Sequence, residues 1–278
     1  MYLFTNLRIK NHRLLIMKIV VIVVCIYFMV LLLAYLLQDK LLFFPHKINH
    51  DFDYNLTAND TELFLKTPDN QIINCIYATL PQNKNVVLYF HGNGSSLNSW
   101  KLVADEIIPQ GANLLMIDYR GYGKSTGTIS EEGFYTDAET AYQFLKTKGY
   151  GDENIFLYGR SLGSGIAVEM AIRHPVKGMI LESPYTSVID VAKSHRPYLF
   201  PGLILRYKFN SLLKAPSIKI PVLIIHGLKD GTIPVTQGEI LAAAINSKKH
   251  LLIIENGNHA NLSSFEVYKK ALNQFLNY

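Results

Sequence analysis

Two kinds of apolar pattern divide the chain. The first is a single run, Ile19–Leu37, which contains no charged residue. The second begins after Thr61, where short apolar runs alternate with longer amphipathic ones. Short runs of Val, Ile and Leu without polar interruption are typical of strands that are covered on both faces. The pattern therefore predicts one long apolar helix followed by a sheet with buried strands.

Strand and helix patterns alternate regularly over the second part of the chain. The predicted strands are Glu62–Lys66, Ile72–Ala78, Val86–Phe90, Leu114–Asp118, Ile155–Tyr158, Met179–Glu182, Val222–His226 and Leu251–Glu255. The predicted helices are Leu97–Ile108, Glu132–Lys148, Leu162–Arg173, Val235–Ile245 and Ser264–Leu276. Such alternation predicts an α/β fold, a mainly parallel eight-stranded sheet with helices on both faces. No strand pattern lies between Ser183 and Lys219, so residues 184–218 are predicted to form a cap over the carboxyl ends of the strands.

The apolar run has the length of a membrane span. As a helix, residues 19–37 would measure roughly 28 Å, close to the hydrocarbon thickness of a bilayer. The preceding arm, residues 1–18, is basic and places the N-terminus in the cytoplasm by the positive-inside rule. The linker 38–60 and the domain 61–278 then lie on the non-cytoplasmic side, in a periplasm or lumen. A cleaved signal peptide is disfavoured because the run is long and lacks an A-x-A-like site. A buried core helix is a further alternative.

Charge and cysteine content narrow the class of protein. The net charge is +5, but residues 1–40 carry +4 of it and the other 238 residues about +1. A domain that is nearly neutral lacks the positive electrostatic potential needed to bind nucleic-acid phosphates, so nucleic acid is not an expected partner. Two cysteines, Cys25 and Cys75, cannot build a disulfide framework.

A nucleophile motif stands between a predicted strand and a predicted helix. Residues 159–163 read G-R-S-L-G, directly after the run Ile155–Tyr158. In this strand–turn–helix context the pattern G-x-S-x-G is typical of a nucleophile elbow, with Ser161 on a strained turn at a helix N-terminus. Larger side chains at Gly159 and Gly163 would collide with the neighbouring strand and helix. The alternative is an ordinary Gly-Ser turn.

Two later loops offer the base and the acid that an activated serine needs. Asp230 follows the strand Val222–His226, and His259 lies between the last predicted strand and the last helix. The order Ser161, Asp230, His259 is that of α/β-hydrolases, and all three loops leave the same edge of the sheet. Asp190 is a rival for the acid. His91, His226 and Asp118 are interpreted as structural.

An oxyanion hole would complete this site. The N–H of Leu162, the residue after the nucleophile, is one expected donor, and the loop H-G-N-G-S-S after Val86–Phe90 is expected to supply the other through Asn93. Arg160 is interpreted as binding neighbouring backbone or carboxylates, with an anionic head group as the alternative. Metal-ligand spacing is not found, and the chemistry requires no cofactor.

Several motifs together resemble the α/β-hydrolase-domain serine hydrolases, in particular the subgroup with one N-terminal membrane anchor. They are H-G-N-G (91–94), D-Y-R-G-Y-G-K-S (118–125), G-R-S-L-G (159–163), E-S-P-Y (182–185), H-G-x-x-D-x-x-I-P (226–234) and G-N-H (257–259). The resemblance covers roughly residues 60–278. It implies the α/β-hydrolase fold, with Ser161, Asp230 and His259 as triad and Asn93 and Leu162 at the oxyanion hole. The usual glycine-glycine-histidine is here Gly257-Asn258-His259.

The expected function is hydrolysis of carboxylic ester or thioester bonds in a lipid, acyl-glycerol or other acylated substrate held near the membrane. The segment Tyr198–Leu205 is apolar enough to line an acyl pocket or to contact the bilayer, and packing on the sheet edge is the alternative. Because the family is similar in sequence to prolyl-oligopeptidase-type peptidases, a serine peptidase is an alternative function. A catalytically silent scaffold of the same fold is another.

Overall fold

An eight-stranded sheet forms the centre of the molecule, with the strand order β1-β2-β4-β3-β5-β6-β7-β8. The computed structural model describes residues 2–278. The strands are β1 (Asp60–Lys66), β2 (Ile72–Ala78), β3 (Asn85–Phe90), β4 (Ala112–Ile117), β5 (Ile155–Arg160), β6 (Gly178–Glu182), β7 (Val222–Gly227) and β8 (Lys249–Ile254). The pairs β1–β2 and β2–β4 are antiparallel and all other neighbours are parallel. The predicted α/β fold with a mainly parallel eight-stranded sheet is therefore confirmed.

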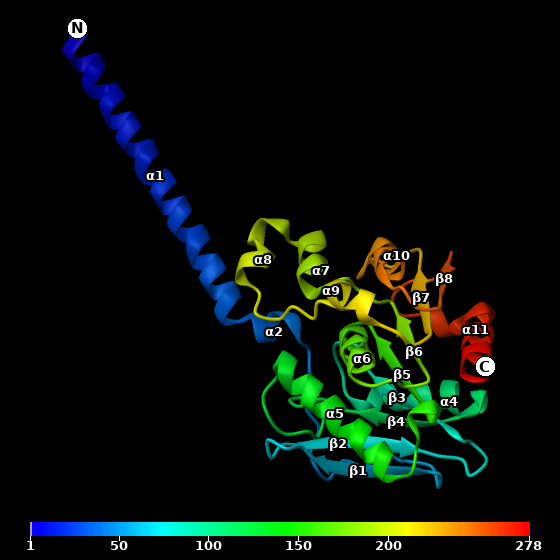
Figure 1. Ribbon diagram of the computed structural model, residues 1–278. Coiled ribbons are helices and arrows are strands. Elements are labelled where there is room, and N and C mark those ends of the chain that lie inside the picture. Colours follow the sequence, from blue (N-terminus) through cyan, green and yellow to red (C-terminus); the bar gives the residue numbers. More distant parts are fainter. Residues whose placement is uncertain (1) are drawn as a thin grey trace.

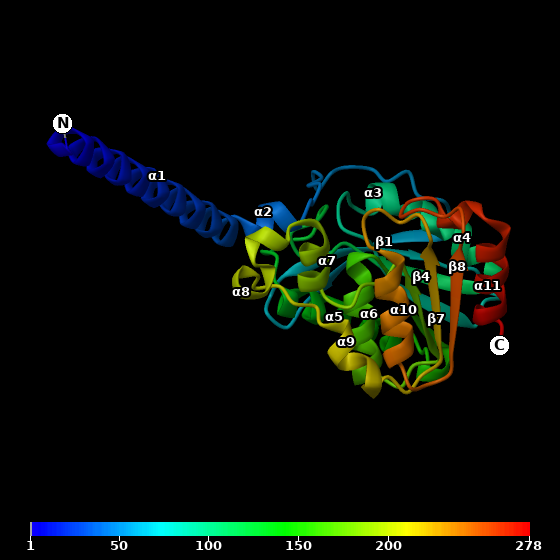
Figure 2. The same cartoon turned by 90° about the horizontal axis from the view of Figure 1, so that it is seen from above.

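Helices cover both faces of this sheet (Figures 1 and 2). The helices α5 (Glu131–Thr147), α6 (Leu162–Arg173) and α10 (Val235–Ala244) pack on one face. The short α3 (Leu97–Trp100) and α4 (Ala104–Ile107) pack on the other face together with α11 (Glu266–Leu276). Successive side chains of β3 alternate between the two hydrophobic clusters, because neighbouring residues of a strand point to opposite faces. The central strands are therefore buried on both sides.

Two predicted helices differ from the observed ones. The segment Leu97–Ile108 is not one helix but a series of short α and 3-10 turns that ends at Gln110. Its first turn is held by bonds to other parts of the fold: the Leu97 N–H donates to the Asp118 carboxylate, and the Trp100 indole donates to the Gly94 carbonyl at 3.2 Å. Such tertiary bonds override the helical periodicity. The last helix begins at Glu266, after a 3-10 turn over Leu262–Ser264.

The N-terminal helix α1 (Tyr2–Leu36) projects away from the domain (Figures 1 and 2). It includes the basic arm 1–18 from Tyr2 onward as well as most of the predicted span 19–37, because residues 2–18 contain no glycine or proline that would end a helix. Its segment His12–Leu36 is long and apolar enough to cross a membrane.

The linker 38–60 is attached to the domain along its length rather than free. It begins with the short helix α2 (Gln38–Leu42). Phe43 and Tyr54 are buried, and isolated β-bridges join Pro45 to Ser95 and Lys47 to Gly123. The rings of Phe43 and Phe134 meet edge to face at 5.6 Å, which ties the linker to α5. Residues 38–60 therefore form part of the domain surface.

The cap, residues 184–218, joins β6 to β7 without forming a strand. It consists of α7 (Val188–His195), a 3-10 turn over Pro197–Leu199, α8 (Pro201–Ile204), α9 (Ser211–Lys214) and a 3-10 turn over Ala215–Ser217. Figure 1 shows α7 and α8 between the lower end of α1 and the carboxyl ends of the strands. This is the position in which a cap can cover a site at that edge of the sheet.

Candidate active site

Ser161 stands on the sharp turn between β5 and α6. Its φ of 51° and ψ of −116° lie outside the regions that residues with a side chain normally adopt. Its N–H donates to the Glu182 carbonyl at 2.9 Å. A Cβ atom at Gly159 would lie 2.4 Å from the Gly163 carbonyl oxygen, and one at Gly163 would lie 2.0 Å from that of Phe90. The two glycines therefore let strand and helix approach closely enough to form the turn.

The loops after β7 and β8 bring two more side chains to the same place. The Nδ1 atom of His259 lies 2.8 Å from Oδ2 of Asp230, and its Nε2 atom lies 3.0 Å from Oγ of Ser161. Along the chain, His259 is 29 positions from Asp230 and 98 positions from Ser161. The three residues proposed from their order in the sequence thus form one continuous chain of hydrogen bonds.

The Asp230 carboxylate is buried and held by several donors. Its Oδ1 atom accepts the backbone N–H groups of Thr232 at 2.9 Å and Ile233 at 2.8 Å. Burial opposes ionisation, but hydrogen bonds from His226, from His259 and from the Ile233 N–H outweigh it and hold the pKa of Asp230 well below its usual range. An ionised Asp230 accepts a hydrogen bond from the Nδ1–H group of His259 and so keeps the proton of the neutral imidazole on Nδ1. The Nε2 atom is then left to accept the proton of the serine hydroxyl.

Asp190, the rival acid, occupies a different position. Its carboxylate accepts the hydroxyl groups of Thr186 at 2.9 Å and Ser187 at 2.7 Å, at the first turn of α7. A third partner, Lys193, lies 3.5 Å away on the same helix. Asp190 therefore stabilises the N-terminus of a cap helix and makes no contact with His259 among the described residues.

The other two histidines near this edge of the sheet, His91 and His226, are buried and hydrogen-bonded to backbone carbonyls. Nδ1 of His91 donates to the Gly92 carbonyl at 2.7 Å, and its Nε2 lies 3.4 Å from the Asp118 carboxylate. Nε2 of His226 donates to the Ile233 carbonyl at 2.9 Å. Burial raises the pKa of Asp118, although His91 opposes this. Within residues 2–278, no group of three or more His, Cys, Asp or Glu side chains is placed to hold a metal ion.

Arg160 holds the loop that carries His259. Its guanidinium donates to the His259 carbonyl at 3.3 Å and forms an ion pair with the buried Glu182 at 3.2 Å. The same group lies over the ring of Trp100, 5.2 Å from its centre. In the sequence, the one sign of a role for Arg160 near this site is that it directly precedes Ser161. The expectation that Arg160 binds backbone and carboxylate describes both contacts.

The loop after β3 lies close to Ser161. A Cβ atom at Gly92 would come 3.5 Å from Cβ of Ser161, so this loop passes close to the serine. Leu162 is the first residue of α6, and its N–H therefore has no partner within the helix. Both predicted oxyanion donors thus belong to segments that adjoin Ser161.

The side chain of Asn93 connects this loop to the linker. Its amide donates to the Leu42 carbonyl at 2.5 Å, and its Oδ1 accepts the Phe44 N–H at 3.2 Å and the Tyr122 hydroxyl at 3.1 Å. Since the side chain is bound to the linker in this way, the backbone N–H of Asn93 is the group that the oxyanion prediction concerns. Sequence reasoning did not anticipate that the segment after α2 would hold this loop.

A cavity of about 590 Å³ opens above Ser161. This volume falls within the range of small-molecule sites, which is roughly 300–1,000 Å³. Its lining comes from the end of α1, from α2 and the linker, from the elbow and oxyanion loops, and from the cap. The lining residues are Ala34, Gln38, Leu41, Leu42, Phe43, Phe44, Asn93, Ser161, Leu162, Tyr185, Val188, Val191, Ala192, His195, Arg196, Leu199, Pro201, Ile204, Leu205, Thr232 and Ile233. Most of these side chains are apolar.

Known proteins resemble the chain over this site. A family model described as "Serine aminopeptidase, S33" matches residues 81–207. An uncharacterized protein of Mycobacterium tuberculosis is 33% identical over 174 residues, which cover 62% of each chain. The alpha/beta hydrolase domain-containing protein 17C of Mus musculus is 30% identical over 223 residues, which cover 77% of this chain and 67% of that protein. The chain thus spans about two thirds of the length of these relatives.

Solved structures share the fold. The esterase Pf2001 of Pyrococcus furiosus superposes with a TM-score of 0.66 at 19% identity, covering 84% of this chain and 98% of that one. An alpha-beta hydrolase of Vibrio vulnificus superposes with a TM-score of 0.67 at 23% identity, covering 79% and 82%. At such low identity this likeness concerns the fold.

Proposed function

Because the chain belongs to the α/β-hydrolase family, we propose that it is a membrane-anchored serine hydrolase that cleaves ester or thioester bonds of acylated or lipid substrates. Its nucleophile would be Ser161, with His259 as general base and Asp230 as the acid that orients the base. The family supports hydrolysis of the ester type. The type of bond cleaved, the catalytic triad and the membrane anchor are proposed here in addition.

The unbroken series of contacts from Asp230 through His259 to Ser161 carries the proposal. Its two distances, 2.8 Å and 3.0 Å, are those of hydrogen bonds, and the serine sits on a strained elbow beneath an apolar cavity. A structural serine needs neither the base nor the strain. Buried polar groups in this arrangement are typical of an activated nucleophile.

Acylation follows from this geometry. Neutral His259 takes the hydroxyl proton of Ser161 at Nε2 while Oγ bonds to the carbonyl carbon of the substrate. The carbonyl oxygen becomes an oxyanion, which accepts hydrogen bonds from the N–H groups of Leu162 and Asn93. The protonated His259, stabilised by Asp230, then donates its proton to the leaving alcohol or thiol as the carbon–oxygen or carbon–sulfur bond breaks. An acyl-Ser161 ester remains.

Deacylation uses the same groups. Water replaces the leaving group, and His259 takes one of its protons as the water oxygen bonds to the acyl carbon. A second oxyanion forms in the same place. Its collapse breaks the bond to Oγ, and His259 returns the proton to Ser161, releasing the carboxylic acid. Every proton that His259 takes is returned within the cycle, so three side chains and two backbone N–H groups carry out all of its steps.

The helix α1 is proposed as a single membrane anchor. Its segment His12–Leu36 has the necessary length and composition, and its side chains from residue 12 onward are mostly exposed. Because Arg8, Lys10, Arg13 and Lys18 precede the charge-free run, the N-terminus is proposed to lie in the cytoplasm. The catalytic domain would then lie in a periplasm or lumen. An anchored domain meets lipid or lipidated substrates at high local concentration.

A serine peptidase is the second candidate function, because the matching family model carries the description of a serine aminopeptidase. The apolar lining of the cavity favours an acyl chain over a peptide, since a bound peptide backbone needs hydrogen-bond partners. A catalytically silent scaffold is the third reading, and the intact geometry of the three side chains counts against it.

The test uses the full chain purified in detergent. Replacing Ser161 by Ala should reduce turnover of a short-chain aryl ester by roughly four to six orders of magnitude and abolish labelling by a fluorophosphonate. Ser194→Ala, at an exposed serine of α7, is the matched control and should change neither readout. A panel of acyl esters, acyl thioesters and peptides then identifies the bond.

Each outcome decides between the candidates. Labelling of wild type with cleavage of peptides but not of acyl esters would establish the peptidase. A folded wild-type protein that neither reacts with the probe nor turns over any ester would establish the silent scaffold. Equal activity of wild type and Ser161→Ala would refute the assignment of the nucleophile.

A further inference from the structure

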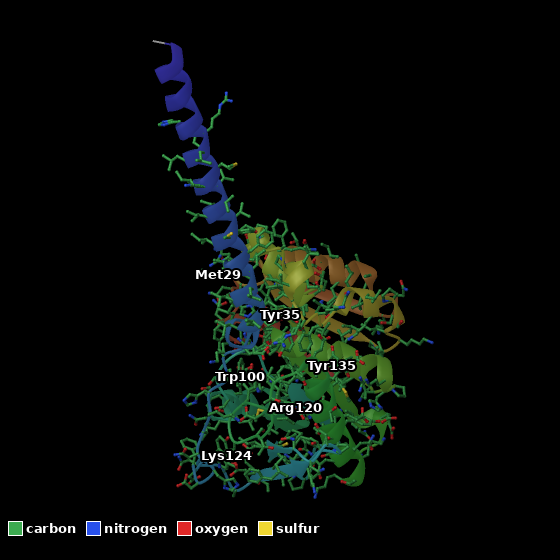
Figure 3. The ribbon with its side chains drawn as sticks, turned by 90° about the vertical axis from the view of Figure 1, so that its left-hand side faces the viewer. Met29, Tyr35, Trp100, Arg120, Lys124 and Tyr135 are labelled. Carbon is green, nitrogen blue, oxygen red and sulfur yellow. The ribbon has the colours of Figure 1, made fainter. Side chains whose placement is uncertain are left out.

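One face of the lower part of α1 packs against the cap. Among the described side chains of α1, residues 12–36, only Tyr27, Leu31 and Ala34 are half-buried. Their spacing of four and three residues places them on one side of a helix. The Tyr27 hydroxyl donates to the Tyr198 carbonyl, and α1 contacts α8. Figure 3 shows the cap beside the part of α1 that carries the labelled Met29 and Tyr35.

If α1 spans a membrane, the position of this contact along the helix determines how deep the cap lies in the bilayer. Tyr27 lies nine residues before Leu36, a rise of about 14 Å, which is nearly half of a 30 Å hydrocarbon core. The hydrocarbon core cannot have its boundary on the N-terminal side of Tyr27. Only the charge-free stretch Ile19–Ile26 would then lie in the core, and at about 12 Å it is too short to span a bilayer. A span through residues 19–37 therefore places Tyr198 inside the leaflet next to the catalytic domain.

The cap segment that meets α1 carries large, exposed apolar side chains. Leu203 is 85% exposed, and Tyr198 and Phe200 are also exposed. Large side chains of this kind are costly in water when they gather on one short segment, and they are favourable in hydrocarbon. Below them, Arg206 is bound to Asp39 of α2 and lies over the ring of Tyr35. Such an arrangement of Arg and Tyr is typical of the membrane–water interface.

The cavity above Ser161 reaches the same place. Ala34 of α1 and Leu199, Pro201 and Ile204 of the cap line it, together with Ser161 at its base. The cavity therefore runs from the nucleophile to the region where α1 and α8 meet. An acyl chain that enters there would pass from hydrocarbon into an apolar lining without crossing water.

We propose that the cap segment Tyr198–Leu205 lies within the membrane leaflet next to the catalytic domain, and that the cavity takes a long acyl chain directly from this leaflet alongside α1. The inference deepens the proposed function and rests on it for the hydrolysis step. The substrate class it names is a long-chain acyl ester or thioester resident in the bilayer. The occupant of the apolar cap surface is the lipid bilayer.

The first experiment locates the cap. The full chain carrying Cys25→Ala is reconstituted into phosphatidylcholine vesicles, and a single cysteine at position 203 or 213 is labelled with the environment-sensitive dye NBD. The remaining native cysteine, Cys75, is buried. Leu213 is the matched control because it is an exposed leucine of the same cap, 76% exposed, but lies on α9 away from α1 (Figure 1).

The dye at 203 should emit at shorter wavelength and be quenched by nitroxides on the lipid acyl chains. The dye at 213 should be quenched by aqueous iodide instead. Equal iodide quenching at both positions would overturn the proposal. A blue shift at 203 that lipid nitroxides do not quench would also overturn it, since a second copy of the chain would then cover the surface.

The second experiment separates the entry route from the chemistry. Leu203→Glu should lower hydrolysis of a long-chain ester embedded in vesicles by roughly tenfold or more, because a charge in hydrocarbon is unfavourable. Hydrolysis of a soluble short-chain ester should not change. Leu213→Glu should leave both rates unchanged. An equal effect of the two variants on the vesicle substrate, or no effect of either, would contradict the proposed route.

The two experiments fail independently of the proposed function. If wild type does not hydrolyse even the soluble ester, the assignment as an esterase fails while the position of the dye still reports where the cap lies. If the soluble ester is hydrolysed and the dye at 203 is in water, the chemistry stands and membrane entry is wrong.

Discussion

The carboxyl edge of the sheet and the cap with its linker share one cavity, yet they are built in opposite ways. Ser161, Asp230 and His259 follow parallel strands whose register with their neighbours fixes where each loop begins. The cap contains short helices and no strand, and it exposes large apolar side chains such as Leu203. The proposed reaction chemistry thus lies where the backbone is most constrained. The proposed selection of the substrate lies where side-chain packing on α1 and α2 decides the shape of the cavity.

The largest expected effect contrasts one carboxylate of each region. Asp230→Asn should lower kcat on a soluble ester by about 10⁴-fold, because an amide at this position favours the wrong tautomer of His259. Asp190→Asn should leave kcat within about twofold, since the Asp190 carboxylate binds Thr186 and Ser187 just before α7 and Lys193 within that helix. Steady-state kinetics of the two purified variants decide the matter. A large loss of kcat in Asp190→Asn would mean that the cap takes part in the chemistry and that the contrast is wrong.

The second prediction concerns how firmly the linker belongs to the domain. Phe43 is 3% exposed and packs on Phe134 and Tyr207, so Phe43→Ala should lower the free energy of unfolding by about 3 kcal/mol. Its neighbour Phe44 is 61% exposed, and Phe44→Ala should change that free energy by no more than about 0.5 kcal/mol. Urea unfolding in detergent measures both. Equal small effects would show that the linker contributes little to folding.

This contrast also explains which parts of the structure could be predicted from the sequence. The strands and the elbow were predicted because strand burial and the steric limits at Gly159 and Gly163 are local in sequence. The order of the three residues along the chain then placed Asp230 and His259 at one edge of the sheet, where the structure brings His259 within hydrogen-bond distance of both Asp230 and Ser161. Periodicity and spacing suffice where parallel strands set the geometry.

The contacts of the linker and cap could not be found in this way. The bonds of Asn93 to Leu42 and Phe44 join segments about fifty residues apart, and no repeating pattern marks either partner. The sequence indicated a linker over residues 38–60, and only the structure shows which side chains, such as Phe43, attach it to the domain. The helix expected over Leu97–Ile108 was likewise broken by tertiary bonds. Interactions of this kind become visible only when the chain is folded.

A third prediction tests whether the sheet edge needs support besides its strands. Arg160→Gln removes the ion pair with Glu182 and weakens the bond to the His259 carbonyl. Kcat should fall by roughly ten- to a hundredfold with KM nearly unchanged, because a displaced base affects the transition state more than substrate binding. Slow fluorophosphonate labelling of Ser161 should persist. A change confined to KM would instead indicate that Arg160 contacts the substrate.

The smallest expected effect comes from the turn between β1 and β2, remote from both regions. Arg120, labelled in Figure 3, binds Asp69 at 2.8 Å, and with help from the Thr67 hydroxyl this bond lowers the pKa of Asp69 from 3.8 to about 2. Since the folded-state pKa lies below the unfolded one, the carboxylate contributes stability that is fully present above about pH 4 and is lost as the pH falls through 2.

Asp69→Asn should therefore destabilise the protein by no more than about 1 kcal/mol at pH 7, because Asp69 is half exposed and solvent screens the pair. The difference between variant and wild type should shrink as the pH is lowered towards 2. Urea unfolding at a series of pH values measures it. Turnover of the soluble ester at pH 7 should not change. A loss of turnover would show that the constrained edge transmits disturbances from the far strands, so that the sheet acts as a single unit in catalysis.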